Sequence, residues 1–446
     1  MNTAIKTLRM VLHQPAGAPR EIGYLSQYGD TLRVSFVDSY INDPQRPTLS
    51  LAYRGQSEAE TRQILSAMRD ARLVTQTGRW PAYFSNLLPE GHNRERLARQ
   101  RGCSVDDEFE LLAAAGHDLM GALEVARVDA QEGIPEQVRH WHTAMGLDVL
   151  EPGSVEMPVD DGSALPGTTV KFSAIQDGRQ GGPRYTVRRQ GEASSFILKL
   201  PTASHPDLVA NEYTCYQLCE AVGLQCAQAR IIARADADLP EQVTFAEPFD
   251  QILAVQRFDR GPHGQRIHME EFAQALQYAP KHKYGKDLLE DYARMLGILN
   301  RYSARPAQDV QEFVHRFVAF AVLGNTDAHL KNWALLYPDG ITPQLAPLYD
   351  VVSVSSYFAE SPLSDYALSL SMDARLQTFG WPELAQLLQR AGVARVGAHV
   401  RKAQALVGKM RERWPALLET APTSLKTTVL ARLNGGLALT KLLSNQ

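Results

Sequence analysis

The sequence predicts an α+β fold of three units, because strand-like and helix-like patterns occupy successive parts of the chain instead of alternating along it. Residues 1–130 have the pattern of a mixed α/β unit, residues 131–255 that of a strand-rich unit, and residues 256–446 that of a mainly helical unit. A chain of 446 residues is also too long for one ordinary core, which favours several packed units.

Composition excludes several classes of protein. Hydrophobic residues make up 44% of the chain and charged residues 22%, which is typical of a folded globular protein. The net charge of −4 does not favour DNA or RNA as the primary ligand. The sequence has no apolar run of about 18 residues and no signal-peptide h-region, so we expect a cytoplasmic protein that does not enter a membrane.

Four cysteines raise the question of a metal site. Cys215 and Cys219 are one helical turn apart, but neither they nor Cys103 and Cys226 form a CxxC motif. Zinc needs further ligands at recognisable spacing, and the sequence offers none. We interpret these cysteines as small buried hydrophobic residues.

The N-terminal elements are predicted from local patterns. Leu32–Val37 has the pattern of a strand, and helical patterns follow at Glu58–Arg69 and Asn93–Arg101. Between residues 131 and 169 the chain becomes rich in Gly, Pro and acidic residues, which is typical of a connecting segment. A short helix is expected within Val138–Leu150.

Strand patterns dominate the middle of the chain. Residues 170–175 (VKFSAI) and 184–189 (RYTVRR) flank the Gly-rich stretch Asp177–Pro183, which predicts a hairpin. Residues 195–200 (SFILKL) form a third predicted strand, and a helix over 208–222 follows.

After residue 265 the patterns are mainly helical. Phe313, Phe317, Phe320 and Ala321 mark one apolar face of a helix. Gly324 follows at the position where a helix commonly ends, because glycine adopts the left-handed conformation of that position without a steric penalty.

The most informative segment is 324–350 (GNTDAHLKNWALLYPDGITPQLAPLYD). Asp327 lies in a polar loop after a buried helix, and Asn332 precedes the apolar strand WALLY. A turn at Pro338–Gly340 returns the chain to Asp350, so we expect the three side chains to converge. Phosphoryl transfer needs this set: one carboxylate takes the acceptor proton, while an amide and a second carboxylate hold Mg²⁺. The alternative is that Asp327 and Asn332 only cap and turn a helix-to-strand connection.

The spacing of Asp327 and Asn332 matches the D-x-x-x-x-N of protein-kinase catalytic loops, although H-R-D is absent and the second carboxylate lies in LYDVVS, not D-F-G.

A second cluster supports the same chemistry. Lys199 lies inside the apolar strand FILKL, where an unpaired lysine is costly, and Glu212 follows on the next helix. A strand lysine on phosphates, held by a helix glutamate, is the arrangement of kinases. The alternative is an edge-strand lysine that extends to water. Together the clusters predict a two-lobed, protein-kinase-like fold.

Two weaker signals complete the predicted site. Leu165–Lys171 (LPGTTVK) has one glycine and a lysine that can surround a phosphate. Leu253–Arg260 (LAVQRFDR) passes from an apolar strand into a polar stretch and is a candidate hinge that faces adenine.

These motifs, in this order, resemble the HipA family of serine/threonine kinase toxins over most of the chain. The resemblance is carried by YFSNLLPEGHNRERLA, LLAAAGHDLMGALEV, FILKLPTA, VANEYTCYQLCEAVGL, AVQRFDR, PKHKY, TDAHLKN and APLYDVVS. It implies a HipA-type N-terminal subdomain in residues 1–130, a nucleotide lobe in 131–255 and a catalytic lobe in 256–446.

By this resemblance, ATP and Mg²⁺ are the cofactors, Asp327 is the catalytic base, and Asn332 and Asp350 are the metal ligands. The other implied nucleotide-site residues are Gly167, Thr168, Thr169, Val170, Lys171, Lys199, Glu212, Gln256, Arg257, Phe258, His329, Lys331 and Tyr349. The chain departs from the family where Thr-Thr-Val replaces a Gln-containing phosphate loop, and where Gln256 replaces a frequent Glu.

The resemblance also implies regulation and partners. Family members are silenced by autophosphorylation of a serine before the phosphate loop; this chain has Ala164 there, with Ser163 adjacent. The implied partners are a helix-turn-helix, HipB-like antitoxin, through which DNA is contacted indirectly, and a protein substrate in translation such as an aminoacyl-tRNA synthetase. Two alternatives remain: a small-molecule kinase, and a catalytically impaired kinase-fold co-repressor.

Overall fold

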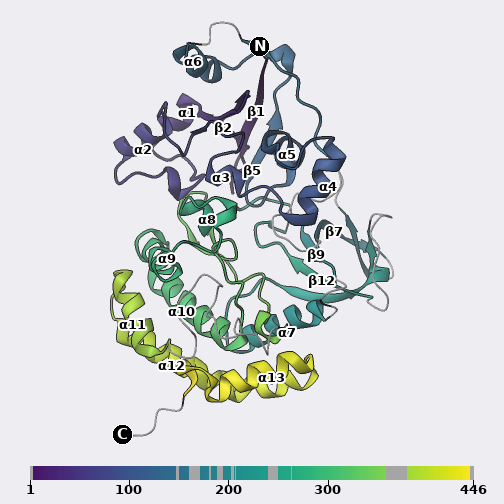
Figure 1. The fold of residues 1–446 in the computed structure, drawn as a ribbon, viewed down its shortest axis with the longest axis vertical. Coiled ribbons are helices and arrows are strands. Elements are labelled where there is room, and N and C mark those ends of the chain that lie inside the picture. The colour runs from purple at the N-terminus through teal and green to yellow at the C-terminus, as the bar shows by residue number, and fades with distance from the viewer. Residues whose placement is uncertain are drawn as a thin grey trace.

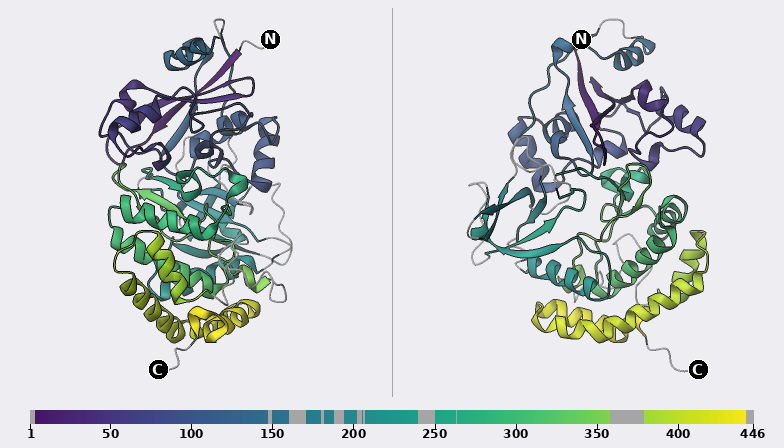
Figure 2. Two further views of the ribbon diagram at one scale, coloured as in Figure 1. Left: turned by 60° about the vertical axis from the view of Figure 1, so that its left-hand side comes forward. Right: turned by 180° about the vertical axis from the view of Figure 1, so that it is seen from behind.

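The computed structural model describes residues 4–146, 150–159, 171–179, 182–187, 194–201, 205, 207–239, 250–262, 264–357 and 379–441. Within these residues the strands form three sheets, which follow one another along the chain (Figure 1). The N-terminal unit lies at one end of the molecule, and the C-terminal helices lie at the opposite end in every view (Figure 2). The predicted α+β class is confirmed.

The N-terminal unit is an antiparallel sheet covered by short helices. Its strands are β1 Ala4–Leu12, β2 Arg20–Tyr28, β3 Thr31–Phe36, β4 Val74–Thr75 and β5 Leu123–Arg127, in the order β4-β3-β2-β1-β5. Its helices are α1 Asp38–Ile41, α2 Glu58–Leu65, α3 Ala82–Ser85, α4 Gly91–Arg101 and α5 Glu108–Ala115. The predicted helix from Glu58 ends four residues early. The helix expected from Asn93 begins at Gly91 and, as predicted, ends at Arg101, where Gly102 adopts the left-handed conformation with φ of 72°.

The segment after residue 130 packs on this first unit. Helix α6 (Glu136–Ala144) begins two residues before the predicted stretch Val138–Leu150 and ends inside it, and its Trp141 donates a 3.0 Å hydrogen bond to Met68 O. Strand β6 (Glu151–Pro152) pairs in parallel with β1. By these contacts, α6 and β6 pack against the N-terminal sheet.

The second sheet has the order β10-β12-β9-β7-β8-β11. Its strands are β7 Lys171–Arg179, β8 Gly182–Val187, β9 Phe196–Lys199, β10 Ala229–Ala233, β11 Ala237–Asp238 and β12 Gln251–Gln256, and helix α7 (Leu208–Ala221) follows β9. Strands β7 and β8 form the predicted antiparallel hairpin and extend further into the Gly-rich stretch than expected. Strand β9 is central, between β12 and β7, which excludes the edge-strand alternative for Lys199.

The third unit is mainly helical around a small sheet. Strands β13 (His268–Glu271), β14 (Ala334–Tyr337) and β15 (Gln344–Leu345) are antiparallel neighbours. The helices are α8 Phe272–Ala275, α9 Leu288–Tyr302, α10 Pro306–Leu323, α11 Trp381–Arg390, α12 Val396–Leu417 and α13 Thr423–Ala431. Helix α8 lies next to the N-terminal unit (Figure 1), where Gln274 donates to Tyr83 O at 3.0 Å. No helix among the described residues is long and apolar enough to span a membrane.

Helix α10 is the buried centre of this unit. Phe313 and Phe317 are completely buried, and the ring centroids of Phe313 and Trp333 are 4.4 Å apart. The helix ends at Gly324, whose φ of 73° is left-handed, while the Asn325 amide bonds to Phe320 O at 3.0 Å. A side chain at this glycine would meet Ser355 Cβ at 2.6 Å. The predicted helix end is confirmed, and it sends the chain into the polar loop that follows.

Candidate active site

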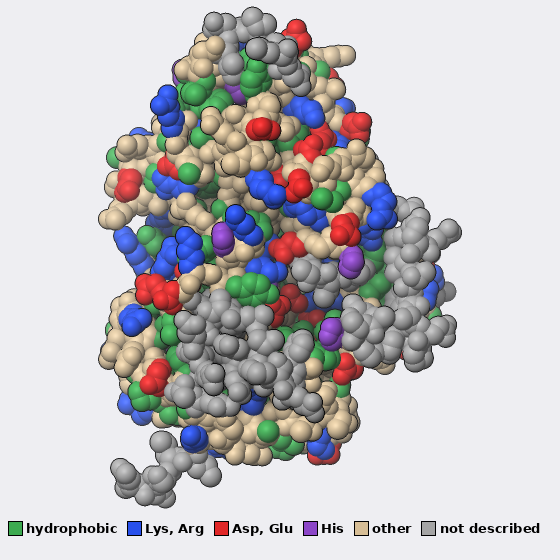
Figure 3. All heavy atoms as spheres, viewed as in Figure 1, with side chains coloured by type: hydrophobic (Ala, Val, Ile, Leu, Met, Phe, Trp, Pro, Cys, Tyr) green, Lys and Arg blue, Asp and Glu red, His purple; other side chains and the backbone are tan. Residues whose placement is uncertain are grey.

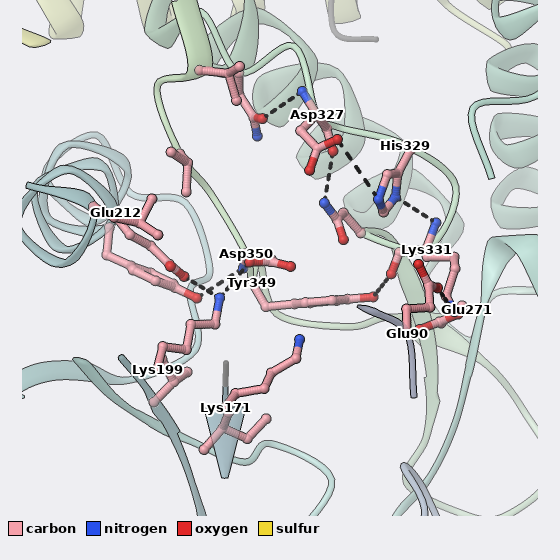
Figure 4. A pocket seen from close by; sticks show the side chains of 18 of the residues that line it. Glu90, Lys171, Lys199, Glu212, Glu271, Asp327, His329, Lys331, Tyr349 and Asp350 are labelled. Atoms are coloured by element: carbon pink, nitrogen blue, oxygen red, sulfur yellow. Dashed lines mark hydrogen bonds and ion pairs between the residues drawn. The ribbon is translucent and has the colours of Figure 1, made fainter. Parts of the chain in front are cut away.

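A cavity of about 400 Å³ lies where the three units meet. Strands β7, β9 and β12 and helix α7 form one side, the loops after α10 and β15 form another, and Glu90 and Met120 contribute from the N-terminal unit. On the face shown in Figure 3, Lys and Arg side chains gather along the boundary between the N-terminal and helical units, with acidic side chains among them. Figure 4 shows the charged side chains that point into the cavity.

Asp327 enters the cavity from the loop after α10. Its backbone N–H donates to Asn325 Oδ1 at 3.2 Å, and Tyr284 Oη donates to its carboxylate Oδ1 at 2.9 Å. About half of the side chain, 48%, is exposed toward the cavity. The surrounding protein still desolvates the carboxylate and raises its pKa to about 6, against the opposing effect of the Tyr284 hydrogen bond. Asp327 is therefore an ionised, weakly basic carboxylate at pH 7.

His329 lies behind Asp327 and is uncharged. Burial and the nearby ammonium group of Lys283 lower its pKa to about 3. Its Nδ1 accepts the Lys331 backbone N–H at 3.3 Å, which leaves the ring proton on Nε2, 4.0 Å from Asp327 Oδ1. Its ring also contacts Tyr284 edge-on at 5.2 Å. His329 therefore packs against the aromatic ring that carries the hydroxyl on Asp327.

The hairpin of β14 and β15 returns the chain to the cavity, as predicted. Asp350 follows this hairpin with a left-handed φ of 55°, which is uncommon outside glycine and is tolerated by aspartate. Its backbone N–H donates to Tyr216 Oη at 3.1 Å. Asn332 donates from Nδ2 to Asp327 O at 2.8 Å, so its Oδ1 is the amide atom left for a cation. Asp327, Asn332 and Asp350 all line the one cavity.

Lys199 joins the two lobes. Its Nζ lies 2.5 Å from Glu212 Oε1 on α7 and 2.5 Å from Asp350 Oδ1. Burial alone would lower the pKa of Lys199, but the two carboxylates outweigh it and raise that pKa above its ordinary value. Burial likewise opposes ionisation of Asp350, whereas Lys199 and Lys171 hold its pKa well below the usual range. Burial raises the pKa of Glu212 to about 7, so Asp350 is the firmer counter-ion of Lys199.

Lys171 lies opposite Lys199 in the pairing of β7 with β9, so the two side chains leave the same face of the sheet. It lines the cavity, and burial lowers its pKa. The rest of the predicted phosphate loop lies outside the described residues. These positions include Gly167, Thr168, Thr169 and Val170, and the predicted autophosphorylation site Ser163 is likewise outside the described residues.

The three residues predicted to form an adenine hinge line the cavity, but the Arg257 side chain pairs with protein groups. Gln256 and Phe258 line the cavity at the end of β12. The Arg257 guanidinium is completely buried and pairs with Asp118 of the N-terminal unit at 3.1 Å and with Asp259 at 2.8 Å. Its backbone N–H is also engaged within the protein, because it donates to Ser195 O at 2.9 Å. The Arg257 side chain thus holds the N-terminal unit against the segment that follows β12.

Lys331 and Tyr349 are at the cavity but are engaged with protein groups. The Lys331 Nζ lies 2.6 Å from Glu90 Oε1 and 3.2 Å from Asn86 O. The Tyr349 hydroxyl donates to Lys331 O at 2.8 Å, and its ring lies 5.5 Å from that of Phe258. Lys331 therefore points toward the N-terminal unit, and Tyr349 and Phe258 form the aromatic part of the cavity wall.

The residues present fit Mg²⁺–ATP. An ionised carboxylate and an amide oxygen are ligands that Mg²⁺ accepts, and it commonly takes only one or two carboxylates together with substrate phosphates. The described residues contain no cluster of three or more His, Cys, Asp or Glu that could hold a metal alone. Two buried lysines face the same cavity and can balance phosphate charge. The described cysteines are all free thiols, and none of them lines the cavity.

Tyr284, Lys283 and Glu90 contact predicted site residues but were not themselves predicted from the sequence. Tyr284 and Lys283 are in the PKHKY stretch, and Glu90 is in the LLPEG stretch. Both stretches carried the family resemblance, which was the available signal for them. Nothing in the local pattern around Glu90 indicates that its side chain reaches the loop of Asp327, because its partner Lys331 is 241 positions away.

The chain is similar to known proteins over most of its length. Residues 17–126 match the HipA N-terminal domain, and residues 163–418 match the HipA-like C-terminal domain. A protein of Sinorhizobium fredii named "Putative kinase Y4dM" is 32% identical over 88% of this chain and 88% of its own length. The serine/threonine-protein kinase toxin HipA of Shewanella oneidensis is 27% identical, over 62% of this chain and 63% of its own.

The fold is shared with a solved structure as well. The structure of the Shewanella oneidensis toxin–antitoxin system HipA, HipB and its operator DNA contains a chain that superposes with a TM-score of 0.60, at 22% identity and with 96% of both chains covered. The two-lobed, kinase-like α+β fold is therefore confirmed. The chain belongs to the HipA family of kinases.

Proposed function

We propose that this chain is an ATP- and Mg²⁺-dependent kinase that phosphorylates serine or threonine hydroxyl groups of proteins. The observation that carries the proposal is the convergence of Asp327, Asn332 and the Lys199–Asp350 pair on one cavity. A carboxylate with a pKa of about 6 matches a general base that works near neutral pH.

Each residue has a part in the proposed transfer. The acceptor oxygen bonds to the γ-phosphorus of ATP as the bond from that phosphorus to the β–γ bridging oxygen breaks, and the hydroxyl proton passes to Asp327. Lys199 and Lys171 orient and neutralise the phosphates, and Asn332 and Asp350 would hold the metal ion. When bound, Mg²⁺ supplies positive charge that stabilises the charge developing on the phosphate oxygens. Phe258, Gln256 and Tyr349 are the proposed adenine-side wall.

The proposed biological role is a growth-arrest toxin of the cytoplasm. A translation protein such as an aminoacyl-tRNA synthetase is the proposed substrate, and a helix-turn-helix antitoxin that binds DNA is the proposed inhibitor. Two similarities support this role: one to a Shewanella kinase named as a toxin, and one to a chain solved in complex with HipB and operator DNA. Autophosphorylation at Ser163 and the unit division at residues 130 and 255 remain predictions.

The proposal is tested with purified protein, γ-labelled ATP and Mg²⁺ in a bacterial lysate. Label on one or a few proteins, lost when the lysate is omitted or EDTA is added, is the expected result. Label only on a metabolite would instead indicate a small-molecule kinase. Nucleotide binding without any transfer would indicate a kinase-fold co-repressor.

A further inference from the structure

Glu90 of the N-terminal unit bridges two lysines of the helical unit. Its Oε1 lies 2.6 Å from Lys331 Nζ, and its Oε2 lies 3.0 Å from Lys283 Nζ. Glu90 occupies the N-cap position of α4 but makes no side-chain cap bond to its own helix. Its carboxylate is directed to the neighbouring unit instead (Figure 4). The geometry points to Glu90 as a positioning residue of the active site, which fixes both segments that hold Asp327.

The first of these segments is the loop 324–332. The Lys331 side chain is only 4% exposed, and its neighbours in the loop are His329 and Asn332. The Lys331 amide donates to His329, and the Lys331 carbonyl accepts from Tyr349. Asn332 in turn donates to the backbone carbonyl of Asp327. Anchoring the Lys331 ammonium group therefore restrains the backbone that carries the base.

Glu90 is the carboxylate that balances Lys331. Glu271 is the other nearby carboxylate, but its Oε2 is 3.7 Å from Lys331 Nζ, and burial raises its pKa to about 7. Burial also opposes ionisation of Glu90, but the ammonium groups of Lys331 and Lys283 outweigh it and lower its pKa to about 2. Glu90 therefore stays ionised at neutral pH and holds both cations.

The second segment contains Lys283 and Tyr284. The Lys283 carbonyl accepts the Leu330 N–H at 2.9 Å, and the next residue, Tyr284, donates its hydroxyl to Asp327. Glu90 Oε1 thus pairs with a lysine of the loop that carries the Asp327 backbone. Glu90 Oε2 pairs with a lysine of the segment that hydrogen-bonds to the Asp327 carboxylate. The N-terminal unit thus positions the catalytic site, and undocking it would slow transfer because both segments that hold Asp327 would lose their carboxylate partner.

The inference deepens the proposed kinase activity and rests on it, so the test has one readout that needs no activity. Glu90→Gln removes the charge and keeps the shape. Its matched control is Glu95→Gln on the same helix, where a 59% exposed carboxylate contacts only His92 among the described residues. We expect Glu90→Gln to lower kcat at least tenfold and to change the KM for Mg²⁺–ATP by less than twofold, with the control unchanged.

Amide hydrogen exchange of the free protein is the second readout. Peptides that cover 326–332 and 280–286 should exchange faster in Glu90→Gln, while peptides of α12 should not change. Lys283→Met removes the ion pair of Lys283 with Glu90. In this background Glu90→Gln should lower kcat by a smaller factor than it does in the wild type. Lys283→Met also tests the inference by itself if Glu90→Gln does not fold.

Three results would overturn the inference: an unchanged kcat with unchanged exchange, a loss of activity with faster exchange throughout the chain, or fully additive effects with Lys283→Met. A wild-type protein that transfers no phosphate would refute the proposed function, and local exchange would still decide the role of Glu90.

Discussion

The ammonium group of Lys199 lies 2.5 Å from the carboxylate of Asp350, so a strand of one lobe and a loop of the other are joined by a direct ion pair across the cavity. Asp350 is the carboxylate proposed to hold Mg²⁺, and Lys199 is the cation proposed to hold phosphate. The same pair that would bind Mg²⁺–ATP thus connects the two lobes. Glu212 also pairs with the Lys199 ammonium group. Its carboxylate can balance the charge of Lys199 when Asp350 binds a metal ion instead.

Asp350→Asn should therefore weaken Mg²⁺–ATP binding as well as turnover. The amide keeps the shape of the side chain but loses the charge that attracts both Lys199 and Mg²⁺. We expect at least a tenfold rise in the dissociation constant for Mg²⁺–ATP by calorimetry, and a smaller change for ATP with EDTA. Equal affinities of variant and wild type for Mg²⁺–ATP would contradict the assignment of Asp350 as a metal ligand.

Tyr284→Phe should slow transfer about tenfold well below pH 6 and about twofold at pH 7, because a hydrogen bond to a charged group contributes roughly 1.5 kcal/mol or more and keeps Asp327 ionised. The Tyr284 hydroxyl stabilises ionised Asp327, so its loss should raise the Asp327 pKa above about 6. The acidic limb of the pH profile of kcat/KM should then move to higher pH. Tyr278→Phe is the control, since that hydroxyl bonds to Asp291 at 2.8 Å and not to Asp327. An unshifted profile in Tyr284→Phe would count against this role.

Glu270→Gln should change the pH dependence of stability. Glu270 is completely buried at the contact of the N-terminal and helical units, where its carboxylate accepts hydrogen bonds from Ser50 Oγ at 2.6 Å, from the Leu51 amide and from Tyr337. Burial raises its pKa from 4.5 to about 7. The folded state then favours the protonated form, so its stabilisation is complete below about pH 4.5 and is lost as the pH rises to 7.

The Glu270→Gln side chain is uncharged at every pH. The variant should therefore lack the pH-dependent part of the free energy of unfolding that Glu270 contributes, which is on the order of 3 kcal/mol or less between pH 5 and pH 8. Melting temperatures of wild type and Glu270→Gln should converge or cross as the pH rises from 5 to 8, whereas Glu95→Gln should follow the wild type. Parallel curves for Glu270→Gln and wild type would show that Glu270 is ionised in the folded protein at both pH values.

The parts of the site that are local in sequence could be predicted, and the parts that join distant segments could not. Asp327 and Asn332 follow a helix end at Gly324, and a hairpin of ordinary length returns Asp350, so periodicity and turn residues place all three. Lys199 stands out because a lysine inside an apolar strand needs a partner. In contrast, the partner of Arg257 is Asp118, 139 positions away. The sequence pattern of a strand end followed by polar residues does not distinguish an arginine that faces a nucleotide from one that faces a neighbouring unit.

The contacts of α6 and β6 could not be predicted for a similar reason. Gly, Pro and acidic residues indicate that a segment is connecting, but they do not indicate which surface it packs on. Trp141 could have indicated this packing, because a large aromatic side chain needs an apolar or cationic surface. The centroid of its ring lies 4.9 Å from the Arg33 guanidinium on the first sheet.

The most direct test of the central claim is transfer of γ-labelled phosphate to protein, with wild type compared to Asp327→Asn at equal nucleotide occupancy. The amide cannot accept the hydroxyl proton, while the groups proposed to bind phosphate and metal remain. We expect transfer to fall by about 10²–10⁴-fold with ATP affinity retained. Equal transfer by Asp327→Asn and wild type would contradict the account.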